Sequence, residues 1–85
     1  MKRNRLDDSS FVFTTYDLGL GAALLCRGFK LLLIDKSKPR TPLLSFKRER
    51  DIENVANSYV MGRLEVKAKS FFDHLETIKI KLRLI

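Results

Sequence analysis

The segment from residue 11 to residue 34 constrains the fold most, because it holds strand, helix and strand signals with almost no residues to spare. Its first residues, Phe11–Thr14, are aromatic or β-branched, which favours a short strand. Thr14 or Thr15 then offers a hydroxyl group that can cap the first turn of a helix. Asp17 follows in that turn, where a carboxylate interacts favourably with the positive end of the helix dipole. A helix is therefore expected from this point.

The helix is expected to end at Gly28, because glycine readily adopts the left-handed conformation that closes helices. Residues 29–35 then form an apolar run that is typical of a largely buried strand. Residues 36–42 contain both prolines of the chain and predict a turn, and residues 43–47 return as the next strand. These two neighbouring strands should form an antiparallel hairpin. The first strand reaches the second through a helix, which predicts a parallel pair with a right-handed crossover.

The second half of the chain predicts two helices. Asp51 begins the first, and Gly62 ends it. Residues 63–66 form a short extended link to the last helix. Residues 78–85 alternate apolar and basic side chains, as a strand does, but no turn signal separates them from the preceding apolar stripe, so we favour helix. That stripe comprises Ala68, Phe71, Phe72, Leu75, Ile78 and Leu82.

These elements predict an α+β fold in the order β-α-β-β-α-α, with a small three-stranded mixed sheet packed on one face by helices. The length of 85 residues suits a single domain over residues 11–85, preceded by a flexible polar tail at residues 1–10. The expected core comprises Phe11, Phe13, Leu18, Leu25, Leu31, Leu33, Leu44, Phe46, Val55, Tyr59, Phe71, Leu75 and Ile78.

Composition excludes several classes of protein. The longest apolar run, Leu31–Ile34, is far shorter than the roughly 20 residues that cross a bilayer. The basic start of the chain is followed by Asp7 and Asp8 where a signal peptide would be apolar, so we expect no signal peptide. Cys26 is the only cysteine, which rules out an intrachain disulfide and favours a reducing cytoplasm.

Positive charge is concentrated in one part of the chain. The formal net charge is +7, and residues 29–50 alone contribute +5 of it. Such a basic segment attracts nucleic acid, and a two-stranded ribbon can enter a major groove. The only aromatic residue between Lys36 and Arg50 is Phe46, which is expected in the core, so base stacking on single strands is not indicated. The alternative is that the cations solvate a small sheet and protect its edges from aggregation. The candidate nucleic-acid-binding residues are Lys36, Lys38, Arg40, Lys47, Arg48 and Arg50.

No residue pattern predicts catalysis. Gly19 and Gly21 lack the third glycine of a dinucleotide-binding loop and are better explained by close packing of a helix. His74 is the only histidine, and its pairing with Cys26 as a base and nucleophile has no support beyond their presence. The carboxylates of Asp7 and Asp8, with Asp17 or Asp73, offer no preorganised metal site. We therefore expect no catalytic residues, no cofactor and no metal.

Several short patterns resemble a known family. They are Thr-x-Asp-Leu-x-Leu from residue 15, Gly-Phe-Lys-Leu-Leu from residue 28, Tyr-x-x-Gly-x-Leu-x-Val from residue 59 and Phe-Phe-x-x-Leu from residue 71. Together they resemble a family of small prokaryotic and viral domains of unknown function, about 80–90 residues long. The resemblance implies the same order of elements and transfers no activity. The chain departs from the family at Tyr16, at Gly21 and at Lys67, where an acidic cap usually precedes the last helix.

The sequence thus predicts a small non-enzymatic binding module that binds nucleic acid through the basic β-hairpin at residues 36–50. The alternative is a protein–protein interaction or homodimeric accessory protein of viral or mobile-element origin with no nucleic-acid role. In that case Phe71 and Phe72 would complete a homodimer rather than only the core. Neither prediction involves a membrane or a small-molecule substrate.

Overall fold

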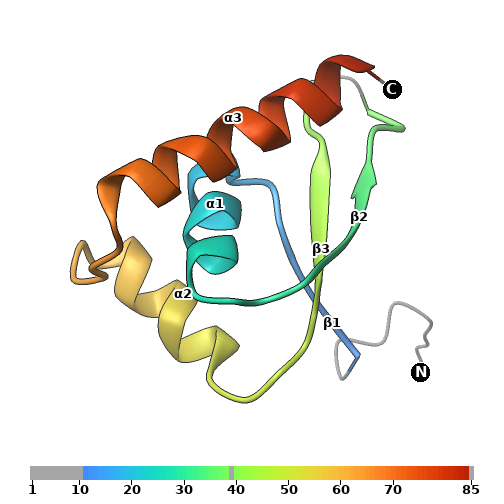
Figure 1. Ribbon diagram of the computed structural model, residues 1–85. Coiled ribbons are helices and arrows are strands. Elements are labelled where there is room, and N and C mark those ends of the chain that lie inside the picture. Colours follow the sequence, from blue (N-terminus) through green and yellow to red (C-terminus); the bar gives the residue numbers. More distant parts are fainter. Residues whose placement is uncertain (1–10, 39, 85) are drawn as a thin grey trace, which may run out of the picture.

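The structure is a computed structural model that describes residues 11–38 and 40–84 (Figure 1). Its elements are β1 (Val12–Thr15), α1 (Leu18–Cys26), β2 (Leu31–Asp35), β3 (Leu43–Lys47), α2 (Ile52–Val60) and α3 (Ala68–Leu84). This confirms the α+β class, the element order and the helical conformation of residues 78–84. The tail expected at residues 1–10 lies outside the described residues.

The sheet differs from the expected mixed sheet in its pairing. β3 lies between β1 and β2 and is antiparallel to both of them. β1 and β2 therefore run in the same direction, as the crossover through α1 requires, but they are not neighbours. Local patterns predict each strand separately and carry little information on which strand lies in the centre. The helices α1, α2 and α3 all lie on the same side of this sheet (Figure 1).

An irregularity in β2 corrects the expected placement of Leu33. Leu31 lies opposite Phe46 and Leu33 opposite Ser45, so one residue, Leu32, is extra in β2. Such a bulge reverses the alternation of side chains beyond it. Leu33 consequently points to the open face of the sheet and is 60% exposed, whereas Ile34 replaces it on the core side.

The start of α1 uses different residues from those expected, and its end is as predicted. Asp17, not a threonine, is the N-cap: its carboxylate accepts a hydrogen bond of 3.2 Å from the Leu20 amide. The Thr15 hydroxyl instead accepts from the Asp17 amide at 3.0 Å and so positions the cap. Gly28 has φ of 89°, the left-handed conformation that terminates the helix.

The other two helices begin after Asp51 and after Lys67. Asp51 precedes α2 with φ of 73° and makes no capping hydrogen bond through its carboxylate, so α2 begins at Ile52. α3 begins after Lys67, whose carbonyl accepts the first hydrogen bond of the helix from the Phe71 amide at 2.9 Å. The cationic side chain at this position therefore does not prevent the first turn from forming.

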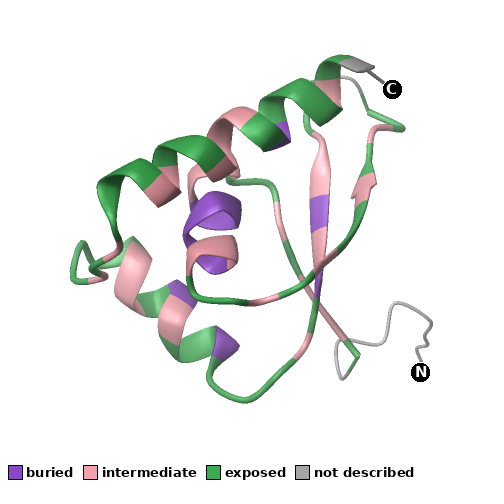
Figure 2. Cartoon of the chain, viewed as in Figure 1, coloured by how far each residue is buried: buried purple, intermediate pink, exposed green. Residues whose placement is uncertain are grey.

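The core is centred on α1, which is enclosed by the sheet, α2 and α3. Figure 2 shows that burial concentrates on α1 and on the central strand, whereas α3 is largely exposed. This is why the short run Leu20–Leu24 is buried on all sides, although the expected core contained none of these residues. Leu44, Phe46 and Ile78 are fully buried, as expected. Most other expected core residues pack partly buried around this cluster, namely Phe13, Leu18, Leu25, Leu31, Val55, Tyr59, Phe71 and Leu75.

Phe11 was wrongly expected in the core. It precedes β1 and is 72% exposed, although its carbonyl accepts a hydrogen bond of 3.1 Å from the Arg48 amide. The start of β1 extends away from the helices (Figure 1), and Phe11 is not among the side chains packed against the core.

Both glycines of α1 lie where neighbouring elements approach closely. A Cβ at Gly21 would collide with the Cδ1 atom of Leu44 and would lie 3.4 Å from that of Ile78. A Cβ at Gly19 would collide with the hydroxyl of Tyr59, which comes from α2. Burial, and to a lesser extent the nearby Asp17 carboxylate, raise the pKa of the Tyr59 hydroxyl. These glycines therefore serve helix packing, as the sequence suggested.

We expect Gly21→Ala to destabilise the protein by about 1–3 kcal/mol, because the added methyl group overpacks a closed core. This cost should exceed the gain of up to ~1 kcal/mol that alanine brings to a helix interior. Gly19→Ala is the matched control. Its added methyl group would meet the hydroxyl of Tyr59, which is the outer end of a partly buried side chain and not part of the closed core. Urea unfolding followed by circular dichroism measures both. A Gly21→Ala variant as stable as the wild type would contradict this packing.

Candidate nucleic-acid interface

The predicted basic residues fall into two groups at opposite ends of β3. Lys36, Lys38 and Arg40 belong to the connection between β2 and β3, whereas Lys47, Arg48 and Arg50 lie at the far end of β3 and beyond it. The five residues of β3 span about 16 Å. The two groups therefore do not form one continuous hairpin surface, and we consider each separately.

The far group is largely engaged within the fold. Arg48 makes an ion pair of 2.6 Å with Glu53 in the first turn of α2, and its guanidinium lies 5.8 Å from the centre of the Phe13 ring. Its Nε is buried and has no hydrogen-bond partner among the described residues. Lys47 lies 3.6 Å from Glu49. Arg50 is exposed and precedes Asp51. Acidic neighbours thus neutralise much of the positive charge here.

The near group is joined by cations from a distant part of the sequence. The Lys36 ammonium donates a hydrogen bond to the carbonyl of Leu82 in the last turn of α3. This contact brings the C-terminal end of α3 beside the β2–β3 connection, as Figure 1 shows. Lys81 and Arg83 flank Leu82 in that turn. We call Lys36, Lys38, Arg40, Lys81 and Arg83 the basic end.

Lys36 has a structural role within the basic end. Its charge lies at the negative end of the α3 dipole, where a cation is stabilising by about 0.3–1 kcal/mol. The other four cations, Lys38, Arg40, Lys81 and Arg83, are exposed. Within the described part of the chain they make no ion pair with a carboxylate. The carboxylate of Asp35 is nearby, and the charge of Lys38 is one of the factors that act on it.

Sequence reasoning missed Lys81 and Arg83. In the sequence both belong to the alternation of apolar and basic residues at positions 78–85. The basic residues of that alternation are the signal that could have indicated them. Only the contact between Lys36 and Leu82 shows that they lie next to the turn.

An aromatic side chain also lies beside the basic end, contrary to what the order of residues suggested. Tyr16 is 60% exposed and lines an open hollow of about 220 Å³ together with Asp35, Ser37 and Lys38. The remaining lining residues are Thr41 and Leu43. Tyr16 comes from the junction of β1 and α1, which is remote in sequence from residues 36–43. The hollow thus combines an exposed ring, a cation and hydrogen-bonding side chains.

Asp35 is held in its charged form within this hollow. Its carboxylate accepts a hydrogen bond of 2.9 Å from the Ser37 amide. The pKa of Asp35 is lowered mainly by that hydrogen bond. The Ser37 side chain and the charge of Lys38 lower it further. At neutral pH the carboxylate therefore accepts hydrogen bonds and repels a phosphate placed directly beside it, so phosphates would be held farther out by the surrounding cations.

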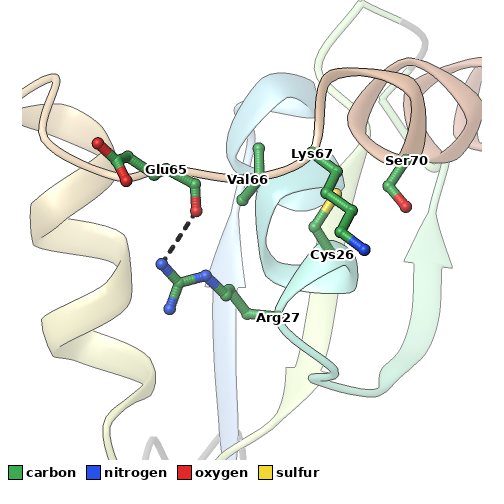
Figure 3. A pocket seen from close by; sticks show the side chains of 6 residues that line it. All are labelled: Cys26, Arg27, Glu65, Val66, Lys67 and Ser70. Carbon is green, nitrogen blue, oxygen red and sulfur yellow. Dashed lines mark hydrogen bonds between the residues drawn. The ribbon is translucent and has the colours of Figure 1, made fainter.

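A second concave site lies elsewhere, between the end of α1 and the start of α3 (Figure 3). It has a volume of about 590 Å³ and is lined by Cys26, Arg27, Glu65, Val66, Lys67 and Ser70. The Arg27 guanidinium donates a hydrogen bond of 3.0 Å to the backbone carbonyl of Glu65. The Glu65 carboxylate points away from the Cys26 thiol (Figure 3). His74 is not among the lining residues, so this site does not contain the pairing of Cys26 with His74 that was considered from the sequence.

The thiol at this site is not activated. Burial raises the pKa of Cys26, which keeps it in the less nucleophilic protonated form at neutral pH. Among the described residues, no three His, Cys, Asp or Glu side chains come together in a group able to hold a metal ion. Asp7 and Asp8, the first residues of the metal site considered above, lie outside the described residues.

The comparison with protein families decides where the chain belongs. The profile of DUF5659, a domain of unknown function, matches residues 10–84, which is nearly the whole chain. The chain belongs to this family. No curated protein and no solved structure matches the chain. Membership in DUF5659 agrees with the resemblance to a family of unknown function and brings no activity with it. In the described part of this DUF5659 chain, no helix is long and apolar enough to span a membrane.

We expect Cys26 to react slowly with iodoacetamide at neutral pH, because its raised pKa leaves little thiolate. The rate should increase as the pH rises past about 8.5, the ordinary value for a thiol. Mass spectrometry of the alkylated protein at a series of pH values measures this. Fast alkylation at neutral pH, with a midpoint below the ordinary value, would show that the thiol is activated after all.

Proposed function

We propose that this protein is a small non-enzymatic module that binds single-stranded nucleic acid through the basic end. The observation that carries the proposal is the convergence of Lys38 and Arg40 with Lys81 and Arg83, from two elements far apart in the sequence. Phosphates attract such clusters, and the energy of this attraction comes largely from the release of counterions.

The state of the charges in the basic end is compatible with anion binding. Outside the basic end, Lys47, Arg48, Lys69 and Lys79 each lie within 4 Å of a carboxylate, whereas Lys30, Arg50, Arg63 and Lys67 have no such described partner. Among the described residues, no carboxylate lies within 4 Å of the four exposed cations of the basic end. These four cations are therefore available to an external anion at a lower desolvation cost.

Tyr16 supports a single strand as the ligand rather than a duplex. Its exposed ring can stack on an unpaired base, and Lys38 lines the same hollow and can contact the adjacent phosphate. The Asp35 carboxylate and the Ser37 and Thr41 hydroxyls of the hollow can accept hydrogen bonds from the base edge. Bases in a duplex are paired and stacked on each other, so they cannot use this combination.

Binding rather than catalysis is supported by the lack of an assembled reactive group at the concave site of Cys26. Burial raises the pKa of the thiol there, and the acidic lining residue Glu65 presents its backbone carbonyl to Arg27. The setting we propose is the reducing cytoplasm of a prokaryotic cell, including one that carries a virus. The single cysteine and the likeness to small prokaryotic and viral domains support it.

We expect the affinity for a labelled single-stranded oligonucleotide to fall with salt, with a log–log slope of roughly −3 for four phosphate contacts. Removing two cations with Lys38→Ala and Arg40→Ala should make this slope shallower by roughly 1.4 and weaken binding roughly 20-fold near 0.1 M salt. Fluorescence anisotropy at several salt concentrations measures both quantities, with single-stranded and duplex DNA and RNA.

The matched control for this experiment is Lys47→Ala with Arg50→Ala, which removes the same charge from the opposite end of β3. It should leave the affinity nearly unchanged. The proposal fails if the wild type does not bind at low salt. Equal losses in the two double variants would instead indicate a non-specific effect of net charge.

We expect Tyr16→Ala to weaken single-strand binding by about 1–3 kcal/mol, which is the usual contribution of stacking by one base. Tyr16→Phe should retain most of the affinity because it keeps the ring. Phe72→Ala removes another exposed aromatic ring, 59% exposed on α3, and should have no effect. Anisotropy at one salt concentration is sufficient. A duplex ligand that loses as much affinity as a single strand would contradict stacking at Tyr16.

A further inference from the structure

The strand β2 forms an edge of the sheet and carries apolar side chains that the fold leaves uncovered. It pairs with β3 on one side only, so the backbone of its other side has no strand partner among the described residues. Leu32 and Leu33 are 50% and 60% exposed. An open hollow of about 250 Å³ runs along this edge, lined by residues 31–34 and by Lys81 of α3. Edges of this kind are templates for pairing with another strand.

The bulge gives this edge a symmetric pattern of side chains. Leu31 and Ile34 lie on the core side of the sheet, opposite the buried Phe46 and Leu44. Lys30 and Asp35 lie on the open side, because neighbouring residues alternate in direction. Leu32 and Leu33, at the bulge, are both exposed between these pairs. From either end of residues 30–35, the first side chain therefore lies on the open side of the sheet and the second on the core side.

The charges of the segment complement those of a second copy. When two copies of residues 30–35 run antiparallel, Lys30 lies opposite Asp35 twice, and Leu31 lies opposite Ile34. Opposite charges at facing positions of paired strands stabilise the pairing. In the fold itself neither Lys30 nor Asp35 makes an ion pair with a described residue. Shifting the register by one residue would place Lys30 opposite Lys36, which is unfavourable.

We propose that β2 is an interface at which two copies of this chain associate, antiparallel and about a twofold axis that passes beside Leu32 and Leu33. The sheet then continues across both copies. This inference does not rest on nucleic-acid binding, although the β2 edge shares Asp35 with the hollow of Tyr16 and Lys81 with the basic end. An interface made by one short strand pair is small, so we expect a weak dimer that forms in the micromolar range.

Sedimentation equilibrium of the full chain tests this proposal directly. The average mass of the wild type should rise from 9.9 kDa toward twice that value as the concentration increases from low micromolar to millimolar. Lys30→Asp alone and Asp35→Lys alone should each remain monomeric, because each places like charges opposite each other twice. An equimolar mixture of the two variants should dimerise again, because both facing pairs are then complementary.

Two further variants keep the outcome decisive. Leu33→Lys should also remain monomeric, and since Leu33 is exposed it should fold normally by circular dichroism. Phe72→Glu places a charge at a different exposed apolar side chain and should leave the dimer intact. A wild type that is monomeric at every concentration would overturn the proposal. So would a dimer that persists in Lys30→Asp and Leu33→Lys but is lost in Phe72→Glu.

Discussion

The close contact between α1 and β3 is the constraint on which the rest of the structure depends. Gly21 has no side chain, so Leu44 of β3 can reach the backbone of α1. α1 is thereby drawn onto the sheet and becomes buried along most of its nine residues. A chain of 85 residues buries a limited core, and this arrangement uses its most apolar helix as the centre of that core.

The placement of α3 follows from that of α1. α3 packs across α1, and Ile78 contributes a fully buried side chain near Gly21. The remaining turns of α3 then project toward the β2–β3 connection, where Lys36 meets the carbonyl of Leu82. The basic end is therefore a consequence of core packing: it assembles cations that are more than forty positions apart in the sequence.

Much of the fold could be predicted because its signals are local. Gly28, the prolines of the turn and the apolar stripe of α3 each act through their own backbone, so the element order was correct. The strand order and the exposure of Leu33 could not be predicted, since both depend on partners. The bulge at Leu32 appears only when β2 is paired with β3. The burial of Leu20–Leu24 likewise depends on α1 being enclosed on several sides.

The residues of the candidate site could be predicted only in part, because tertiary contacts decide which of them are exposed together. Lys38 and Arg40 are adjacent in a turn, so their exposure could be inferred locally. Arg48 was misleading because Glu53 pairs with it from the next helix. Tyr16 was missed because only tertiary structure brings it to the turn, and Lys81 because only the contact of Lys36 with Leu82 brings the end of α3 there. A strong basic segment in the sequence thus indicated the region, and the fold selects which of its charges are available.

The most direct test of the account is a map of NMR chemical-shift changes when a short single-stranded oligonucleotide is added to the full chain. We expect the changes to cluster at Tyr16, in the connection around Lys38 and Arg40, and in the last turn of α3 around Lys81 and Arg83. Residues 47–53, at the opposite end of β3, should change little. Changes centred on residues 47–53, or none at low salt, would contradict the claim that the basic end binds nucleic acid.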